Sequence, residues 1–158
     1  MPPGDTLAGI FAQEIDSLTQ LQSILEQEYD ALVNADVIAI ETLSASKNAA
    51  LNLQADLTRA RQATLRNAAF SDTPEGLQQL IDQSDNRESL AAAYRTLTDL
   101  AARCRESNRS NGRLILQKQR QASEALDILR RTDAASPTYS SQGKADASGP
   151  GGRSLGKA

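Results

Sequence analysis

Apolar residues recur at helical spacing over three long stretches of the chain, with short polar breaks between them. In the first stretch, from about residue 6 to 34, large apolar side chains follow at intervals of three and four or their multiples. This spacing predicts an amphipathic helix. Glu14 and Glu28 fall on the same stripe and interrupt it. The apolar stripe consists of Leu7, Phe11, Leu18, Leu21, Leu25 and Leu32.

Asn34, Ala35 and Asp36 form a short break, after which the helical spacing resumes from residue 37 to about 69. Asp36 can cap the second helix, because an aspartate at this position accepts a hydrogen bond from a free backbone N–H. Two long helices joined by so few residues are expected to fold back as an antiparallel hairpin. A single continuous helix through Asn34 is the alternative that the pattern leaves open.

Two more helices are predicted after a second break. Thr73 followed by Pro74 is a good start signal, since proline at the first helical position loses no needed N–H. It predicts a short helix over residues 75–83. A long helix then runs from residue 86 to about 131, with a heptad seam along it. The seam consists of Leu90, Tyr94, Leu97, Ala101, Cys104, Asn108, Asn111, Ile115, Lys118, Ala122, Ala125 and Leu129.

The character of the sequence changes after Thr132, where small and polar residues dominate. Tyr139 is the only aromatic residue of this stretch and Leu155 its only large aliphatic one, so it cannot bury enough surface to offset its ordering entropy. We therefore predict an all-α domain over residues 1–131 and a flexible, disordered tail over residues 132–158. The predicted domain is a long antiparallel helical hairpin plus a long C-terminal helix, which together form an elongated coiled-coil-like bundle.

Charge is spread unevenly, although the formal net charge is only −3. Residues 1–58 carry nine acids and one base, a balance of −8, whereas residues 101–131 carry eight bases and three acids, a balance of +5. A basic helix can bind nucleic acid or an anionic membrane. We favour an acidic first segment that lies beside the basic last segment in one bundle. The aromatic content of 3% leaves few platforms for stacking on single strands, so no nucleic-acid partner is predicted.

Residues that support catalysis or metal binding are scarce. The sequence has no histidine, which removes the commonest general base and the commonest metal ligand. Cys104 falls on the heptad seam and is interpreted as a small core residue, and a single cysteine indicates a reducing compartment. There is no phosphate-binding glycine motif, signal peptide or long apolar run. We predict a cytoplasmic binding protein with no catalytic residue, metal, cofactor or stable membrane insertion.

Residues 108–115 read N-R-S-N-G-R-L-I, an unusual interruption of a helical seam. Gly112 costs roughly 1 kcal/mol relative to alanine within a helix, and buried asparagine amides need partners. The segment is either a register-setting polar layer with glycine allowing close helix approach, which the physics favours, or a groove where another chain docks. Residues 137–143 leave a similar choice between an inert linker and a partner anchor at Tyr139.

These segments resemble the FlgN family of flagellar export chaperones. The N-x-x-N-G-x-L-I motif, a leucine-rich stretch (Leu126, Ile128, Leu129) and a T-Y-x-x-x-G tail motif occur in the order expected of that family. The resemblance covers residues 5–143. It implies a cytoplasmic chaperone that holds a terminal segment of hook-associated (hook–filament junction) proteins and delivers them to the flagellar type III export apparatus. The candidate partner-binding residues are Asn108, Asn111, Gly112, Leu114, Ile115, Leu126, Leu129, Tyr139 and Gly143.

Two other classes stay open from the residues alone. A coiled-coil adaptor could self-associate through the seam of the long helix, and an oligomer sensitive to Asn111→Leu would favour that class. A basic-helix binder of nucleic acid or anionic membrane would show strongly salt-dependent binding.

Overall fold

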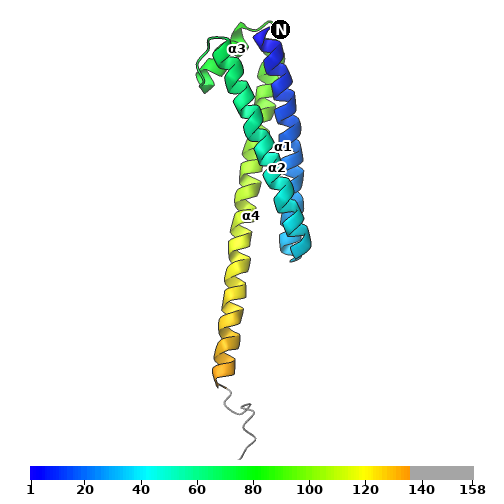
Figure 1. Cartoon of the computed structure of the whole chain (residues 1–158), viewed down its shortest axis with the longest axis vertical. Helices are drawn as coiled ribbons and strands as arrows, with labels where there is room; N and C mark the ends of the chain where they lie inside the picture. Colours follow the sequence, from blue (N-terminus) through cyan, green and yellow to red (C-terminus); the bar gives the residue numbers. More distant parts are fainter. Residues whose placement is uncertain (136–158) are drawn as a thin grey trace, which may run out of the picture. The chain divides into compact units, whose positions relative to one another are not determined.

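The computed structural model describes residues 1–135, which form α-helices joined by short turns (Figure 1). The helices are α1 (Pro3–Val33), α2 (Val37–Asn67), α3 (Pro74–Gln83) and α4 (Arg87–Ala135). The described part of the chain contains no strand, which confirms the predicted all-α class. The chain divides into two compact units, residues 1–116 and the residues from Gln117 on, and α4 contributes to both. The predicted tail lies almost entirely outside the described residues, so a domain boundary at 131 stays a prediction.

The turn between α1 and α2 reverses the chain and confirms the predicted hairpin, in which α1 and α2 run side by side (Figure 1). Ala35 has a φ of 52°, in the left-handed region, so the helix cannot continue through it. Asp36 then caps α2, because its Oδ1 accepts a hydrogen bond from the backbone N–H of Ala39 at 3.1 Å. The alternative of one continuous helix through Asn34 is therefore wrong.

Ala35→Gly is expected to stabilise the protein by on the order of 0.5–1 kcal/mol. Alanine is strained at a φ of 52°, whereas glycine adopts this conformation without a steric penalty. Thermal unfolding followed by circular dichroism measures the change. Ala45→Gly, at an exposed position inside α2, is the matched control and should destabilise by about 1 kcal/mol. Equal destabilisation by both substitutions would contradict the assignment of the turn.

The core of residues 1–116 is formed mainly by α1, α3 and the first part of α4. Leu90, Leu97 and Cys104 are buried at successive heptad positions, so this half of the predicted seam is confirmed. Phe11 of α1 stacks on Tyr94 of α4 with the ring centroids 5.8 Å apart. The helix α2 contributes little apolar burial by comparison. The other large buried apolar side chains of residues 1–116 are Leu7, Ile10, Leu18, Leu21, Leu25, Leu32, Leu57, Leu65, Leu77, Leu80 and Ile81.

The predicted seam does not remain buried along the whole of α4. In the unit that begins at Gln117, the seam positions Ala122, Ala125 and Leu129 are all exposed. A heptad pattern records which residues share a helix face, and it cannot say whether a neighbour covers that face. The predicted seam residues of this half therefore share a helix face that is exposed in the described structure.

Two buried ion pairs join α1 to α2. Glu14 pairs with Arg61, and Glu28 pairs with Lys47, each with a nitrogen–oxygen distance of 2.8 Å. Residues 14 and 28 are as far apart along α1 as residues 47 and 61 are along α2, so both pairs have the same antiparallel register. Slipping the hairpin by one turn would bury two unpaired carboxylates, which is costly. The glutamates that interrupt the apolar stripe therefore specify the register of the hairpin.

The acidic helix α1 lies beside the start of the basic segment of α4, as predicted, because Cys104 and Asn111 donate hydrogen bonds to the backbone oxygens of Leu18 and Leu25. The buried acids of α1 are neutralised by cations of α2, and no ion pair between α1 and α4 occurs among residues 1–135. Arg109 and Arg113 of α4 pair instead with Glu106 of the same helix. These pairs are exposed and contribute little to stability.

Candidate binding sites

The structure places Asn111, a predicted partner-binding residue, inside the core. Its side chain is 2% exposed, and its Nδ2 donates to the backbone oxygen of Leu25 and to Oε1 of Glu28, both at 2.9 Å. The buried amide is therefore satisfied by α1. This arrangement matches the polar layer that sets helix register, and it leaves Asn111 little surface to offer a partner.

The polar layer extends across three helices. Lys47 of α2 donates to Glu28 and, at 3.3 Å, to Oδ1 of Asn108 on α4. The chain of contacts thus runs from Asn111 through Glu28 and Lys47 to Asn108. Because Asn108 is exposed, it forms the solvent-facing end of this network.

Gly112 does not serve close packing of another helix within the described chain, and its predicted role in partner binding stays a prediction. A Cβ built on this residue would meet no atom within 4 Å, so no helix of the described chain approaches it closely. Leu114 and Ile115 are half-buried. Expecting a close helix contact at the glycine was therefore wrong, and the structure gives no packing reason for a glycine here.

Asn111→Leu is expected to destabilise the fold by about 1–3 kcal/mol, because the Leu25 carbonyl and the Glu28 carboxylate lose a buried donor. Urea unfolding at neutral pH measures this loss. Asn108→Leu is the control on the same helix, and it should change stability by less than about 0.5 kcal/mol since Asn108 is exposed. Equal effects would contradict the structural role of Asn111. The variant is consequently a poor probe of self-association.

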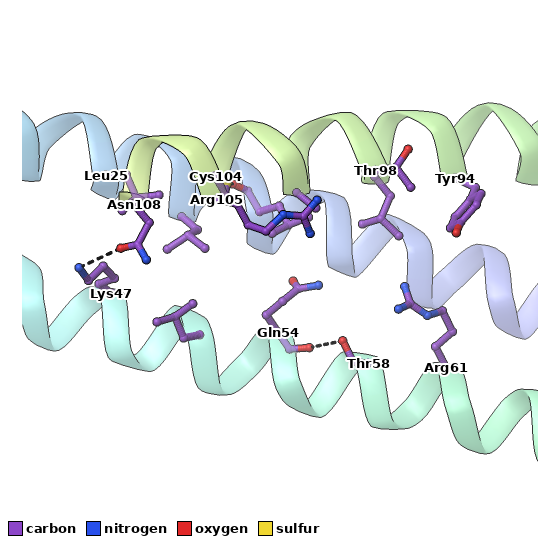
Figure 2. A pocket seen from close by; sticks show the side chains of 15 residues that line it. Leu25, Lys47, Gln54, Thr58, Arg61, Tyr94, Thr98, Cys104, Arg105 and Asn108 are labelled. Carbon is purple, nitrogen blue, oxygen red and sulfur yellow. Dashed lines mark hydrogen bonds between the residues drawn. The ribbon is translucent and has the colours of Figure 1, made fainter. Parts of the chain in front are cut away.

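An apolar groove that the sequence analysis did not anticipate lies between α2 and α4, with α1 as its floor (Figure 2). Its volume is about 420 Å³, within the range of ligand-binding pockets. Figure 2 shows Gln54 and Arg61 rising from α2 toward the other helices, with Thr98 and Arg105 on the facing helix. The groove is lined by Leu18, Leu21, Leu25, Lys47, Leu51, Gln54, Thr58, Arg61, Tyr94, Leu97, Thr98, Ala101, Cys104, Arg105 and Asn108.

The electrostatics of the groove depend on Glu14, which is completely buried beside it. Burial raises the pKa of Glu14, while the charge and hydrogen bonds of Arg61 act in the opposite direction. Arg61 donates through Nη1 to both carboxylate oxygens, at 2.8 and 2.9 Å. Gln54 also donates to Glu14, at 3.4 Å. The groove wall is thus held in place by a buried charge on α1.

A second surface is the exposed apolar face of α4 beyond Gln117. Leu126 is 54% exposed, Ile128 63% and Leu129 60%. Leu126 and Leu129, both predicted partner-binding residues, share a helix face because they are three residues apart. Tyr139 and Gly143, the remaining predicted residues, lie outside the described part of the chain.

Neither surface has the features of a catalytic centre. Cys104 is buried, its thiol donates to the backbone oxygen of Leu18 at 3.4 Å, and burial raises the pKa of the thiol against the effect of nearby Arg103. A raised pKa lowers the thiolate fraction and with it the nucleophilicity. Residues 1–135 contain no cluster of three or more side chains suited to hold a metal ion. None of the helices in this range is long and apolar enough to cross a membrane.

The fold and these surfaces define a class: an all-α binding protein built on a helical hairpin, with exposed apolar surface on its long last helix. The sequence matches the model of the family described as FlgN protein over residues 1–147, and the chain belongs to the FlgN family. This is a family of flagellar-assembly chaperones rather than enzymes, which confirms the resemblance seen in the sequence.

A solved structure supports the same assignment. The chain is similar to a protein of Pseudomonas aeruginosa, described as a flagella synthesis protein, FlgN, whose crystal structure was determined at 1.48 Å resolution. The two are 29% identical with a TM-score of 0.67, and the match covers 82% of this chain and 99% of the other. A comparison with curated proteins gives no match.

Proposed function

We propose that this chain is a cytoplasmic export chaperone that binds hook-associated proteins, prevents their premature association and delivers them to the flagellar type III export apparatus. Membership of the FlgN family supports a role in flagellar assembly. The choice of hook-associated proteins as clients is what the resemblance to the FlgN family implies.

The observation that carries this proposal is the exposed apolar face of α4. In the unit from Gln117 on, Leu126, Ile128 and Leu129 are each more than half exposed. Leu126 and Leu129 share a helix face because they are three residues apart, and exposed apolar side chains that share a face can form an interaction site. The clients would present an amphipathic terminal helix, and pairing of two apolar faces would shield that helix from premature assembly.

Binding of this kind is reversible, as delivery requires. Only a few large side chains take part on the chaperone, and ordering of the client segment subtracts from the contact free energy. Release at the export apparatus then needs no nucleotide site in the chaperone itself.

Complex formation is the direct test. The full chain is mixed with a purified hook-associated protein, and the mixture is followed by isothermal titration calorimetry and size-exclusion chromatography. A stoichiometric complex at micromolar concentrations is expected. If the two proteins elute separately and no heat is detected, the proposed client class is overturned.

The same leucines could instead serve a self-associating adaptor, because a heptad face pairs with a copy of itself. Sedimentation velocity of the chain alone distinguishes the two functions. A monomer that gains mass only with the client supports the chaperone. A tight oligomer that dissociates on Leu126→Asp with Leu129→Asp would support the adaptor.

A further inference from the structure

The groove between α2 and α4 has the shape of a helix-binding site. Leu18, Leu21 and Leu25 are spaced three and four residues apart on α1 and form its floor. At the rim, Leu51 of α2 is 44% exposed, a large apolar side chain at the mouth of the groove. The floor leucines are at most 5% exposed, so the apolar side chain that an occupant would meet first is Leu51 at the rim.

The length of the groove is close to that of four helical turns. Lys47 and Arg61 of α2 lie at opposite ends of the groove, and so do Asn108 and Tyr94 of α4 (Figure 2). At about 1.5 Å per residue, each pair spans about 21 Å along its helix. A volume of about 420 Å³ accommodates the side chains of one helix face, while the rest of the occupant would lie over the rim.

The charge of the groove selects the kind of helix. Three of its lining residues are cationic (Lys47, Arg61, Arg105) and none carries a carboxylate. Lys47 and Arg61 are already paired with Glu28 and Glu14 of α1, so Arg105 supplies the net positive charge. Arg105 has no ion-pair partner among residues 1–135. Arg61 pairs with Glu14 through Nη1 alone, which leaves its other N–H groups available. Carboxylates on either side of an apolar stripe would complement these cations.

We propose that this groove docks an amphipathic α-helix of about four turns from a second protein, with its apolar face over Leu51 at the mouth of the groove and flanking carboxylates on Arg105 and Arg61. The site consists of residues different from the leucines of α4 assigned above to the client. A negative result for hook-associated proteins as clients would therefore not contradict the groove site, and a negative result for the groove would not contradict the client class.

A designed peptide pair tests the charge preference. The probe is a fluorescein-labelled helical peptide of about 16 residues, with leucines at positions i, i+3, i+4 and i+7 and glutamates beside them, and the control carries lysines in place of the glutamates. Fluorescence anisotropy with the full chain should give micromolar binding of the glutamate peptide and binding at least about tenfold weaker for the lysine peptide. Equal affinity for both peptides would overturn the assigned charge selectivity.

Two matched pairs of variants test the location. Leu51→Glu should weaken binding of the glutamate peptide by about tenfold or more, whereas Leu53→Glu, at a residue equally exposed (47%) but outside the groove, should leave it within about twofold. Likewise, Arg105→Glu should weaken it and Arg103→Glu, on the same helix but outside the groove, should not. Equal effects within either pair would place the peptide elsewhere and overturn the proposal.

Two further measurements separate this proposal from its competitors. Leu126→Asp with Leu129→Asp should retain full affinity for the glutamate peptide, and loss of binding in that variant would contradict a site at the groove. Sedimentation equilibrium is measured for the unmodified chain and for the Leu51→Glu variant. No dimer that is present in the first and lost in the second is expected. Such a dimer would identify a second copy of the chain as the occupant and overturn docking of a different protein.

Discussion

Arg61→Leu is expected to lower the free energy of unfolding at pH 7 by about 3–5 kcal/mol, because it leaves the carboxylate of Glu14 buried without a counter-charge. Glu14 is completely buried, whereas the side chain of Arg61 is 21% exposed. Removing the arginine is therefore the more damaging change, since an arginine left alone can reach solvent and a glutamate at this position cannot. Urea unfolding monitored by circular dichroism gives the free energy directly.

Two controls accompany this variant. Arg59→Leu removes an exposed arginine from the same helix, paired with Asp56, and should change stability by less than about 1 kcal/mol. Arg61→Leu combined with Glu14→Leu replaces the buried pair by apolar side chains and should recover most of the loss. A double variant as unstable as Arg61→Leu alone would show that packing, rather than the unpaired charge, explains the result.

The pH dependence of Arg61→Leu follows from the same carboxyl group. A carboxyl whose pKa is raised by folding contributes most to stability below its ordinary value of 4.5, and that contribution is lost as the pH rises through the folded pKa. Arg61 opposes the rise, so its removal pushes the pKa of Glu14 higher and extends the loss toward neutral pH. The deficit of Arg61→Leu relative to the unmodified chain should shrink as the pH is lowered toward 4.5. A deficit independent of pH would contradict this explanation.

Leu126→Asp together with Leu129→Asp is expected to weaken the complex with a hook-associated protein by about 100-fold or more. Each leucine is more than half exposed, so the substitutions remove apolar contact area for the client without opening a cavity in the described fold. An apolar contact at the centre of an interface that acts as a hot spot costs about 2 kcal/mol or more when it is removed, and a charge in its place adds desolvation cost. Isothermal titration calorimetry with the full chain measures the change.

Gln117→Asp with Gln121→Asp is the control for added charge. Both glutamines are exposed on α4, so this variant gains the same two negative charges without losing a leucine. Its affinity should remain within about threefold of the unmodified chain. If both double variants weaken the complex equally, electrostatic repulsion along α4 explains binding better than an apolar contact. Unchanged helicity in both variants confirms that the fold is intact.

Much of the fold could be predicted from local pattern. The 3.6-residue spacing of apolar side chains identified the helices, and Asp36 and Thr73 marked two of their starts as N-caps, with hydrogen bonds to Ala39 and Gly76. The role of Glu14 and Glu28 was missed, although a signal was present. Two acids on one helix and two bases on the next, at equal separation in sequence, fit an antiparallel hairpin with two cross-helix pairs.

The candidate sites were less predictable, because burial depends on what covers a helix face. Asn111 and Leu129 occupy the same heptad seam in the sequence, yet Asn111 is buried against α1 and Leu129 is exposed. The groove exists because of the distance between α2 and α4, and no local sequence pattern specifies that distance. Its lining side chains come from three helices and include Leu51, which is 44% exposed.

The sequence by itself determined the helices, the hairpin and the family, because these follow from the order and spacing of residue types along one chain. The tertiary structure decided which polar seam residues are satisfied inside the core and which face solvent. It also decided where two helices separate enough to leave an apolar floor between cationic walls. The physical reason is that hydrogen bonding and burial of a side chain depend on distances between helices, whereas helix formation depends on neighbours three and four residues away.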